Sequence, residues 1–398
     1  MARVLRIAYV FERFPSFGQT FLYREVAELV RQGAEVTIFS IRKPTGEPSQ
    51  DWDENLVKTV HYLPDEAELV REISRAMRGR ELPPAAVRAI TEWDRQSDFL
   101  RLYQAAYIGL RLPKAGITRV HAHFAGMAAR TAYWLKQFFG IAYSVTAHAN
   151  DIFAPRNFVV SLGKIFDAAT AIVTVSDFSA AQLRERFPAN RAKLHRVYNG
   201  IDVAAFAPSE LSSEPPLIVS VGRLIEKKGF AELIRACAIL KQRGRDFRCE
   251  VIGEGPLQQE LAAQITDAGL DERVQLVGPL SQLEIADRLR VANVFVLACT
   301  TDADGGMDNL PTVIMEAMAA CLPVVSTPIA GVPEMVEPGL TGELVPPRDA
   351  TALAGGIAQL LADRQTAGQF GRAGRARAAE RFSIEANVRA LATLLQQP

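Results

Sequence analysis

The sequence has few cysteines and no long apolar run. It contains four cysteines in 398 residues, they lie far apart, and no Cys-x-x-Cys pair occurs. Three of them lie in apolar stretches, so we expect buried thiols in a reducing cytosol and neither a disulfide framework nor a zinc site. No apolar run approaches the ~20 residues that span a bilayer. Residues 1–10 lack the apolar core of a signal peptide, so the sequence predicts a cytoplasmic protein.

Net charge is also absent from the chain as a whole. The sequence has 45 Lys and Arg residues against 45 Asp and Glu residues, with 48% hydrophobic residues, which is typical of a globular protein and speaks against a nucleic-acid partner. This balance hides an asymmetry. Residues 1–200 carry a net charge of +7 and residues 201–398 carry −7. Opposite charges would help to hold the two halves together.

Short β-branched runs alternate with amphipathic helical patterns along most of the chain. This alternation predicts parallel sheets built from βαβ units, and the length suits two α/β domains of nearly 200 residues each. In the first half we expect helices over Thr20–Arg31 and Met127–Phe139 and further peripheral helices over 44–116. The strands expected in the two halves are Leu5–Phe11, Glu35–Ile41, Thr118–Phe124, Ala142–Ala147 and Ala171–Val175, then Leu217–Val221, Cys249–Ile252, Val274–Val277, Val294–Leu297 and Val324–Ser326.

A polar, proline-rich segment, 207–216, is the one plausible linker. We therefore predict an N-terminal domain over 1–206 and a C-terminal domain over 207–383. Residues 384–398 contain an amphipathic helix that can pack on either domain, including back on the first. Ligands of such sheets bind at the carboxyl ends of the strands, so two facing sheets would enclose one cleft.

Two cations follow the first strand of the second half. Arg223 comes directly after Val221-Gly222, and Lys228 lies close to the start of a helix, where free N–H groups also favour an anion. This pattern suits a pyrophosphate. A solvated basic turn explains it equally well on these residues alone.

A second candidate segment spans 302–318. Its glycines let the backbone bend around a ligand, and Pro311 is typical of a first helical turn, so Asn309 to Thr312 would offer unpaired N–H groups. Glu316 lies in an apolar stretch of that helix, where a carboxylate is costly unless it is hydrogen bonded. Ribose or sugar hydroxyls would supply those bonds, and a buried ion pair with an arginine is the alternative. Asp302 and Asp304 resemble loop charge more than a ligand pair.

Two glycines are weaker candidates. Gly253 lies between a strand and a helix, where a tight turn explains it without a ligand. Gly18 precedes the helix at Thr20 and would let backbone approach a phosphate from the opposite side of the cleft, while an N-cap at Thr20 explains the same residues structurally.

Histidines at strand ends are the candidates in the first half. His148 and Asp151 lie at the carboxyl end of a strand, so His148 could orient or deprotonate an acceptor hydroxyl. His121 and His123 lie on one side of another strand at a spacing that could bind a metal. We see no third ligand nearby, so we interpret them as ordinary sheet histidines.

As an ordered set, these segments resemble the large family 4 of retaining glycosyltransferases, which have the GT-B fold of two Rossmann-like domains facing across a cleft. The likeness covers nearly the whole chain, and 14–21 with the His-Ala-His-Phe strand further resembles enzymes of exopolysaccharide biosynthesis of the colanic-acid type. The stretches that carry it are 14–21, 120–124, 175–176, 198–202, 221–224, 227–229, 253–256 and 309–316, with Ala319, 323–325 and Thr327 downstream.

The resemblance implies a metal-independent, cofactor-free transfer of a sugar from a UDP- or GDP-sugar to a saccharide or lipid-linked acceptor, with retention of configuration. It implies that the diphosphate is bound by cations, that Glu316 holds the ribose and that His148 lies by the reacting sugar. Asp308 stands where the family usually has a glutamate. The candidate catalytic residues are His148, Asp308, Arg223 and Lys228; those for the donor are Gly18, Arg223, Lys228, Gly253, Asn309, Leu310, Pro311, Thr312 and Glu316; Asp151 is assigned to the acceptor side.

Three other interpretations remain open at this point. The chain could be a catalytically weak nucleotide-sugar-binding partner of a polysaccharide assembly complex, or another GT-B enzyme such as an epimerase or a phosphorylase-like enzyme. Residues 71–119 carry ten Lys and Arg against five Asp and Glu, which suits a peripheral contact with the anionic inner face of a membrane. A solvated helix face explains the same charges.

Overall fold

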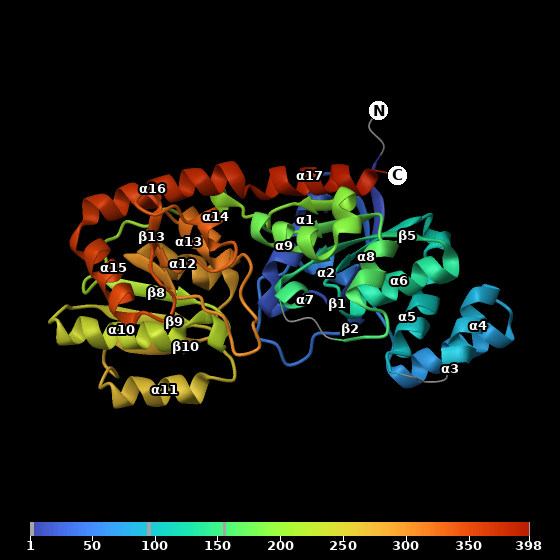
Figure 1. Ribbon diagram of the computed structural model, residues 1–398, viewed down its shortest axis with the longest axis horizontal. Coiled ribbons are helices and arrows are strands. Elements are labelled where there is room, and N and C mark those ends of the chain that lie inside the picture. The colour runs from blue at the N-terminus through green and yellow to red at the C-terminus, as the bar shows by residue number, and fades with distance from the viewer. Residues whose placement is uncertain (1–3, 94–96, 154–156, 398) are drawn as a thin grey trace.

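The computed structural model describes residues 4–93, 97–153 and 157–397, which fold around two parallel sheets. The first sheet has seven strands in the order β3-β2-β1-β4-β5-β6-β7, and the second has six in the order β10-β9-β8-β11-β12-β13. Helices cover the sheets, which occupy opposite ends of the molecule (Figure 1). The expected α/β class with two doubly wound domains is confirmed.

The strands that the sequence predicts are all present to within two residues at either end. They are β1 (Arg6–Arg13), β2 (Glu35–Arg42), β4 (Arg119–His123), β5 (Ala142–Ala147), β6 (Ala171–Thr174), β8 (Leu217–Val221), β9 (Arg248–Ile252), β10 (Val274–Gly278), β11 (Val294–Leu297) and β12 (Val324–Ser326). Three further strands were not predicted: β3 (Val60–Tyr62), β7 (Leu194–Arg196) and β13 (Gly342–Leu344). The 44–116 segment is therefore mostly helical, but it also adds an edge strand.

The two predicted helices of the first half are present with the predicted bounds. The α-helices described in the first half are α1 (Thr20–Arg31), α2 (Glu54–Lys58), α3 (Glu66–Arg78), α4 (Pro84–Trp93), α5 (Leu100–Gly109), α6 (Met127–Phe139), α7 (Ala149–Phe153), α8 (Leu162–Ala168) and α9 (Asp177–Arg186). Those of the second half are α10 (Phe230–Gln242), α11 (Gln258–Asp267), α12 (Gln282–Val291), α13 (Thr312–Ala319), α14 (Val332–Met335), α15 (Ala350–Ala362), α16 (Arg364–Arg381) and α17 (Ile384–Gln396).

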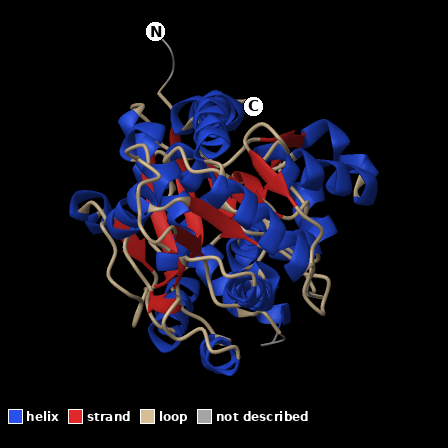
Figure 2. Cartoon of the chain, turned by 90° about the vertical axis from the view of Figure 1, so that its left-hand side faces the viewer, coloured by secondary structure: helices blue, strands red, loops and turns tan. Residues whose placement is uncertain are grey.

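The C-terminal helix α17 packs on the first domain. Its buried residues Val388, Leu391 and Leu394 belong to the same apolar cluster as Tyr9 and Val26. α16 and α17 follow one another along one side of the molecule and so span both domains (Figure 1). Figure 2, turned by 90°, shows the C-terminus on this same upper side. No described helix is both long and apolar enough to cross a membrane.

Three of the cysteines, Cys237, Cys249 and Cys299, are buried free thiols as expected, and Cys321 is a half-buried one.

Candidate active site between the two sheets

A cleft of about 830 Å³ lies between the two domains and is lined by both of them. On each side it begins at the point where the strand order reverses, between β1 and β4 in the first sheet and between β8 and β11 in the second. Open parallel sheets bind ligands at this point. Of the residues assigned above to catalysis, the donor and the acceptor, all except Asp151 line the cleft.

Lys228 and Asp308 form an ion pair within the cleft. Burial lowers the pKa of the Lys228 ammonium, but the charge and hydrogen bond of Asp308 together with Cys299 and Glu316 outweigh it, and the pKa lies above its ordinary value. Burial likewise raises the pKa of Asp308, and the charge and hydrogen bond of Lys228 bring it below its usual value. Both groups are therefore charged at neutral pH, and Asp308 neutralises the cation that an incoming anion would meet.

Arg223 is the free cation on this side of the cleft. Its side chain is exposed and has no partner among the residues that the structure describes. Lys228 follows in a short 3-10 helix, Glu226–Lys228, which ends at Gly229 with a φ of +70°. A side chain at Gly229 would overlap the carbonyl oxygen of Ala298, so glycine lets the start of α10 approach the end of β11. This close approach places Lys228 against the second sheet.

Gly253 lines the cleft, and the fold explains its identity. Its φ is +139°, and a side chain there would overlap the carbonyl of Gly222 in the neighbouring turn. Gly253 thus allows the turns after β8 and β9 to pack together at the floor of the cleft.

The segment before α13 supplies backbone to the cleft and a side chain to the domain interface. The Asn309 side chain is buried and bonded to Ser176 Oγ at 2.6 Å and Ser179 Oγ at 2.9 Å, both from the first domain. The Asn309 amide is therefore already hydrogen bonded within the protein. Pro311 is the N-cap rather than a first-turn residue, and α13 begins at Thr312. Donors toward a ligand can come only from the backbone here.

Glu316 is bonded to an arginine of the opposite domain. Arg24 Nη2 lies 2.7 Å from Glu316 Oε1 and also donates to Gln282 Oε1. The other carboxylate oxygen of Glu316, Oε2, has no partner among the described residues. Glu316 can thus keep its ion pair and still accept a hydroxyl. Sequence reasoning missed Arg24, because its partner is 292 positions away.

Gly18 is exposed at the opposite wall of the cleft, in a 3-10 turn over Phe17–Gln19. α1 begins at Thr20, its N-cap is Gln19, and no side chain caps it. The alternative explanation of this segment, an N-cap at Thr20, is therefore wrong.

His148 is buried at the cleft between two aromatic rings, with ring centroids 5.3 Å from Phe21 and 4.3 Å from Phe124. Loss of water and the neighbouring His123 hold the pKa of His148 well below its ordinary value, so it is neutral. Asp151 accepts from the His148 backbone N–H at 2.9 Å, and burial raises the pKa of Asp151 to about 6. Asp151 orders this loop and does not line the cleft.

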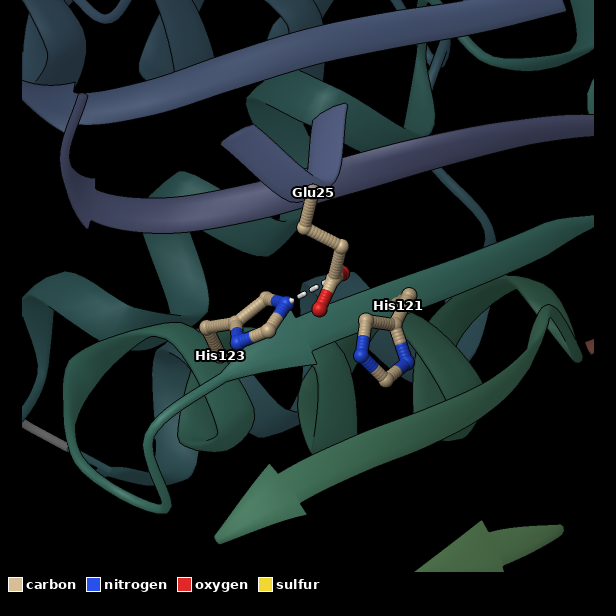
Figure 3. Close-up of side chains that lie close together, drawn as sticks. All are labelled: Glu25, His121 and His123. Atoms are coloured by element: carbon tan, nitrogen blue, oxygen red, sulfur yellow. Dashed lines mark hydrogen bonds and ion pairs between the residues drawn. The ribbon is translucent and has the colours of Figure 1, made fainter. Parts of the chain in front are cut away.

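His121 and His123 have a third possible metal ligand nearby, so the prediction that none exists is wrong. Glu25 of α1 points at them, and one ligand atom from each of the three residues lies within 4.8 Å of the others (Figure 3). These ring nitrogens already have partners, however. His121 contacts Ser144 Oγ at 2.7 Å and Thr146 Oγ1 at 3.0 Å. His123 contacts Glu25 and His148.

Two open α/β sheets with a cleft at facing switch points are the arrangement of the GT-B fold. The fold is shared with a glycosyltransferase from Rickettsia africae (TM-score 0.74, 18% identity, 99% and 98% of the two chains). It is also shared with the HepE protein of Anabaena, solved in complex with UDP (TM-score 0.73, 18% identity, 98% and 99%).

The sequence identifies the family. Residues 18–205 match Glycosyltransferase Family 4, and residues 204–377 match Glycosyl transferases group 1. The amylovoran biosynthesis glycosyltransferase AmsK of Erwinia amylovora is 30% identical over 99% of this chain and 100% of its own length. The putative colanic acid biosynthesis glycosyltransferase WcaL of Salmonella typhimurium is 29% identical over 98% and 100%. The chain belongs to this glycosyltransferase family, as the sequence predicted.

Proposed function

We propose that the protein transfers a sugar from a nucleoside diphosphate sugar with retention of configuration and without a metal, in the assembly of an exopolysaccharide. The observation that carries this proposal is the arrangement of the cleft. Arg223 and Lys228 lie on one wall with the start of α13, Glu316 has a free carboxylate oxygen, and Gly18 lies opposite. A diphosphate, a ribose and a sugar would each find matching groups.

The cations supply the electrostatic part of the reaction. Negative charge grows on the diphosphate as it leaves, and fixed donors aimed at such charge contribute roughly 3 kcal/mol each to the transition state. Arg223, Lys228 and the N–H groups of the first turn of α13 would take this part in place of a metal. The acceptor hydroxyl would attack on the face from which the diphosphate leaves, and the diphosphate would take its proton.

Glu316 provides the test of the site. Thermal stability measured with UDP, GDP, ADP and TDP, each with and without EDTA, should rise with one nucleotide, since a ligand at a hundred times its dissociation constant adds about 2.7 kcal/mol. We expect the rise to survive EDTA and to be lost in Glu316→Ala. No rise with any nucleotide, or a rise abolished by EDTA, would contradict the proposal.

A nucleotide-sugar-binding partner without turnover is the second candidate, and the Lys228–Asp308 pair favours it. Asp308 neutralises Lys228 in the free protein, and a diphosphate must displace or share it. Nucleotide binding with no release of product from any sugar donor would support this candidate. An epimerase would instead return a changed nucleotide sugar without an acceptor.

The acceptor is a saccharide or a lipid-linked saccharide in this proposal. A membrane contact through 71–119 would rest on α3 and α4, which lie at the end of the molecule far from the second domain (Figure 1). The exposed cations among the described residues of 71–119 are Arg71, Arg75, Arg78, Arg80, Arg88 and Lys114, whereas Arg101 is buried against Asp98. Residues 94–96 lie outside the described residues. Co-sedimentation with anionic liposomes at low salt tests this contact.

A further inference from the structure

A continuous chain of side-chain hydrogen bonds leads from α1 through β4 to the cleft. Glu25 Oε1 lies 2.9 Å from His123 Nε2, and His123 Nδ1 lies 3.2 Å from His148 Nε2. Tyr9 lies at the end of this series that is farther from the cleft, and its hydroxyl donates to Glu25 Oε1 at 3.0 Å. Figure 3 shows Glu25 reaching down from its helix to His123 on the strand. The chain ends at His148, which lines the cleft.

The donors and acceptors of this chain determine which nitrogen of His148 carries the hydrogen. A carboxylate only accepts, so His123 carries its hydrogen on Nε2, and its Nδ1 is a lone pair. His148 must then donate from Nε2 to that lone pair. Because a neutral imidazole has one N–H and one lone pair, Nδ1 of His148 is left as an acceptor.

The opposite order of hydrogens would need an additional proton on His123. That charge would lie at a ring centroid distance of 4.9 Å from His121 and 5.5 Å from His148, in a region from which water is excluded. Glu25 at 2.9 Å would be its hydrogen-bonded counter-ion, but a singly protonated His123 already makes that bond by donating from Nε2. The arrangement with one hydrogen on each imidazole therefore satisfies every bond of the series without a further proton.

We propose that Glu25 and His123 are positioning residues that present His148 to the cleft with Nδ1 as a hydrogen-bond acceptor. This nitrogen has no partner among the described residues, and the rings of Phe21 and Phe124 fix its plane. It accepts a hydrogen from a hydroxyl and cannot donate to an ether or carbonyl oxygen. The identity of that hydroxyl, on the donor sugar or the acceptor, rests on the proposed function.

Nitrogen NMR of the protein without ligand tests this series of hydrogen bonds directly. The polypeptide has five histidines, so ¹⁵N-labelled imidazoles can be assigned one by one with single substitutions. We expect the Nε2–H tautomer at both His123 and His148 in the wild type. Glu25→Leu should give a mixture of tautomers at His148, whereas Glu25→Gln keeps an acceptor oxygen and should retain the wild-type tautomer.

His121→Gln is the matched control. It removes a buried imidazole from the same strand, but one bonded to Ser144 and Thr146 and not to the chain, so the His148 tautomer should not change. An Nδ1–H tautomer at His148 in the wild type, or no response to Glu25→Leu, would overturn the proposal. So would shifts of the His121 and His123 nitrogens on adding Zn²⁺ that EDTA reverses, because a metal would then hold these nitrogens.

Turnover separates this inference from the proposed function. We measure release of UDP from UDP-glucose and of GDP from GDP-mannose. If the wild type turns over, Glu25→Leu should lower kcat about tenfold or more with KM for the donor nearly unchanged, and Glu25→Gln should restore it. A full kcat in Glu25→Leu would overturn the positioning role. If the tautomers respond as expected but the wild type never turns over, the proposed function is contradicted, whereas the positioning of His148 by Glu25 and His123 is supported.

Discussion

The two walls of the cleft differ in how they hold their polar groups. On the side of the second sheet the groups are charged: Lys228 is paired with Asp308, Glu316 with Arg24 of the first domain, and Arg223 has no partner among the described residues. On the side of the first sheet Arg13 and Glu47 form an ion pair 3.0 Å long at the cleft, but the buried histidines His121 and His148 are neutral, with pKa values well below their ordinary value because burial disfavours their charged form. In the proposed function, the side of the second sheet would exchange an internal counter-ion for an anion, and the side of the first sheet would direct uncharged hydroxyls.

The largest effect should come from removing charge on the charged wall. Lys228→Ala should lower the turnover rate by roughly a hundredfold or more, since a fixed cation at the leaving group contributes several kcal/mol. Steady-state kinetics measure this. Lys227→Ala is the matched control, because Lys227 bonds Asn150 at 3.2 Å across the cleft and should change the rate only a few-fold. A Lys228→Ala rate within a few-fold of wild type would remove Lys228 from the mechanism.

A smaller effect should appear in the pH dependence of stability, because the two walls carry groups whose pKa values are shifted differently. His121 and His148 have folded pKa values below the unfolded value of about 6.5, so the unfolded chain binds more protons and stability falls as pH drops below about 6.5. Each would contribute a slope of about 1.4 kcal/mol per pH unit. Asp151 opposes this between about pH 6 and 4, because its pKa is raised to about 6. Asp308, with its lowered pKa, should lose its contribution only below about pH 4.

The tryptophans allow this acid response to be assigned to one domain. All three, Trp52, Trp93 and Trp134, lie in the first half of the chain. Tryptophan fluorescence should therefore report acid unfolding of the first domain at a higher pH than circular dichroism reports for the whole chain, and His121→Gln should reduce the difference. Coincident transitions that do not change in the variant would show that the neutral wall is not acid-sensitive.

The smallest effect concerns the contact that joins the walls. Asn309→Ala removes the bonds to Ser176 and Ser179, but these two hydroxyls still bond one another at 2.6 Å. We expect a loss of about 1 kcal/mol in urea unfolding. Nucleotide binding should persist, because in the proposed site the donors would be backbone N–H groups of this segment and not the Asn309 side chain. If Asn309→Ala abolished nucleotide binding without unfolding the protein, the side chain would belong to the ligand site.

Sequence patterns located the elements that have enough residues to show a period. α1, α6, β5 and β8 have the bounds predicted for them. The three missed strands, β3, β7 and β13, have three residues each and lie at sheet edges, where pairing to one neighbour decides the structure and no alternation can develop. The predicted domain bounds remain predictions.

The candidate site was predictable where a motif follows a strand. Arg223, Lys228 and Glu316 were found in this way, and the cleft brings them together. Arg24 and Glu25 were missed because each is an ordinary polar residue of an amphipathic helix. Their partners Glu316 and His123 are 292 and 98 positions away. Spacing along a helix does not reveal such contacts, so the roles of the site residues also remain proposals.

The packing of α17 on the first domain has a consequence for the order of synthesis. Leu391 and Leu394 complete the apolar cluster around Tyr9 and Val26, yet the ribosome makes them only after the whole second sheet. Part of the apolar surface of the first domain is therefore uncovered while the second domain is translated. A nascent chain stalled before Ile384 would leave this part of the apolar cluster of the first domain exposed.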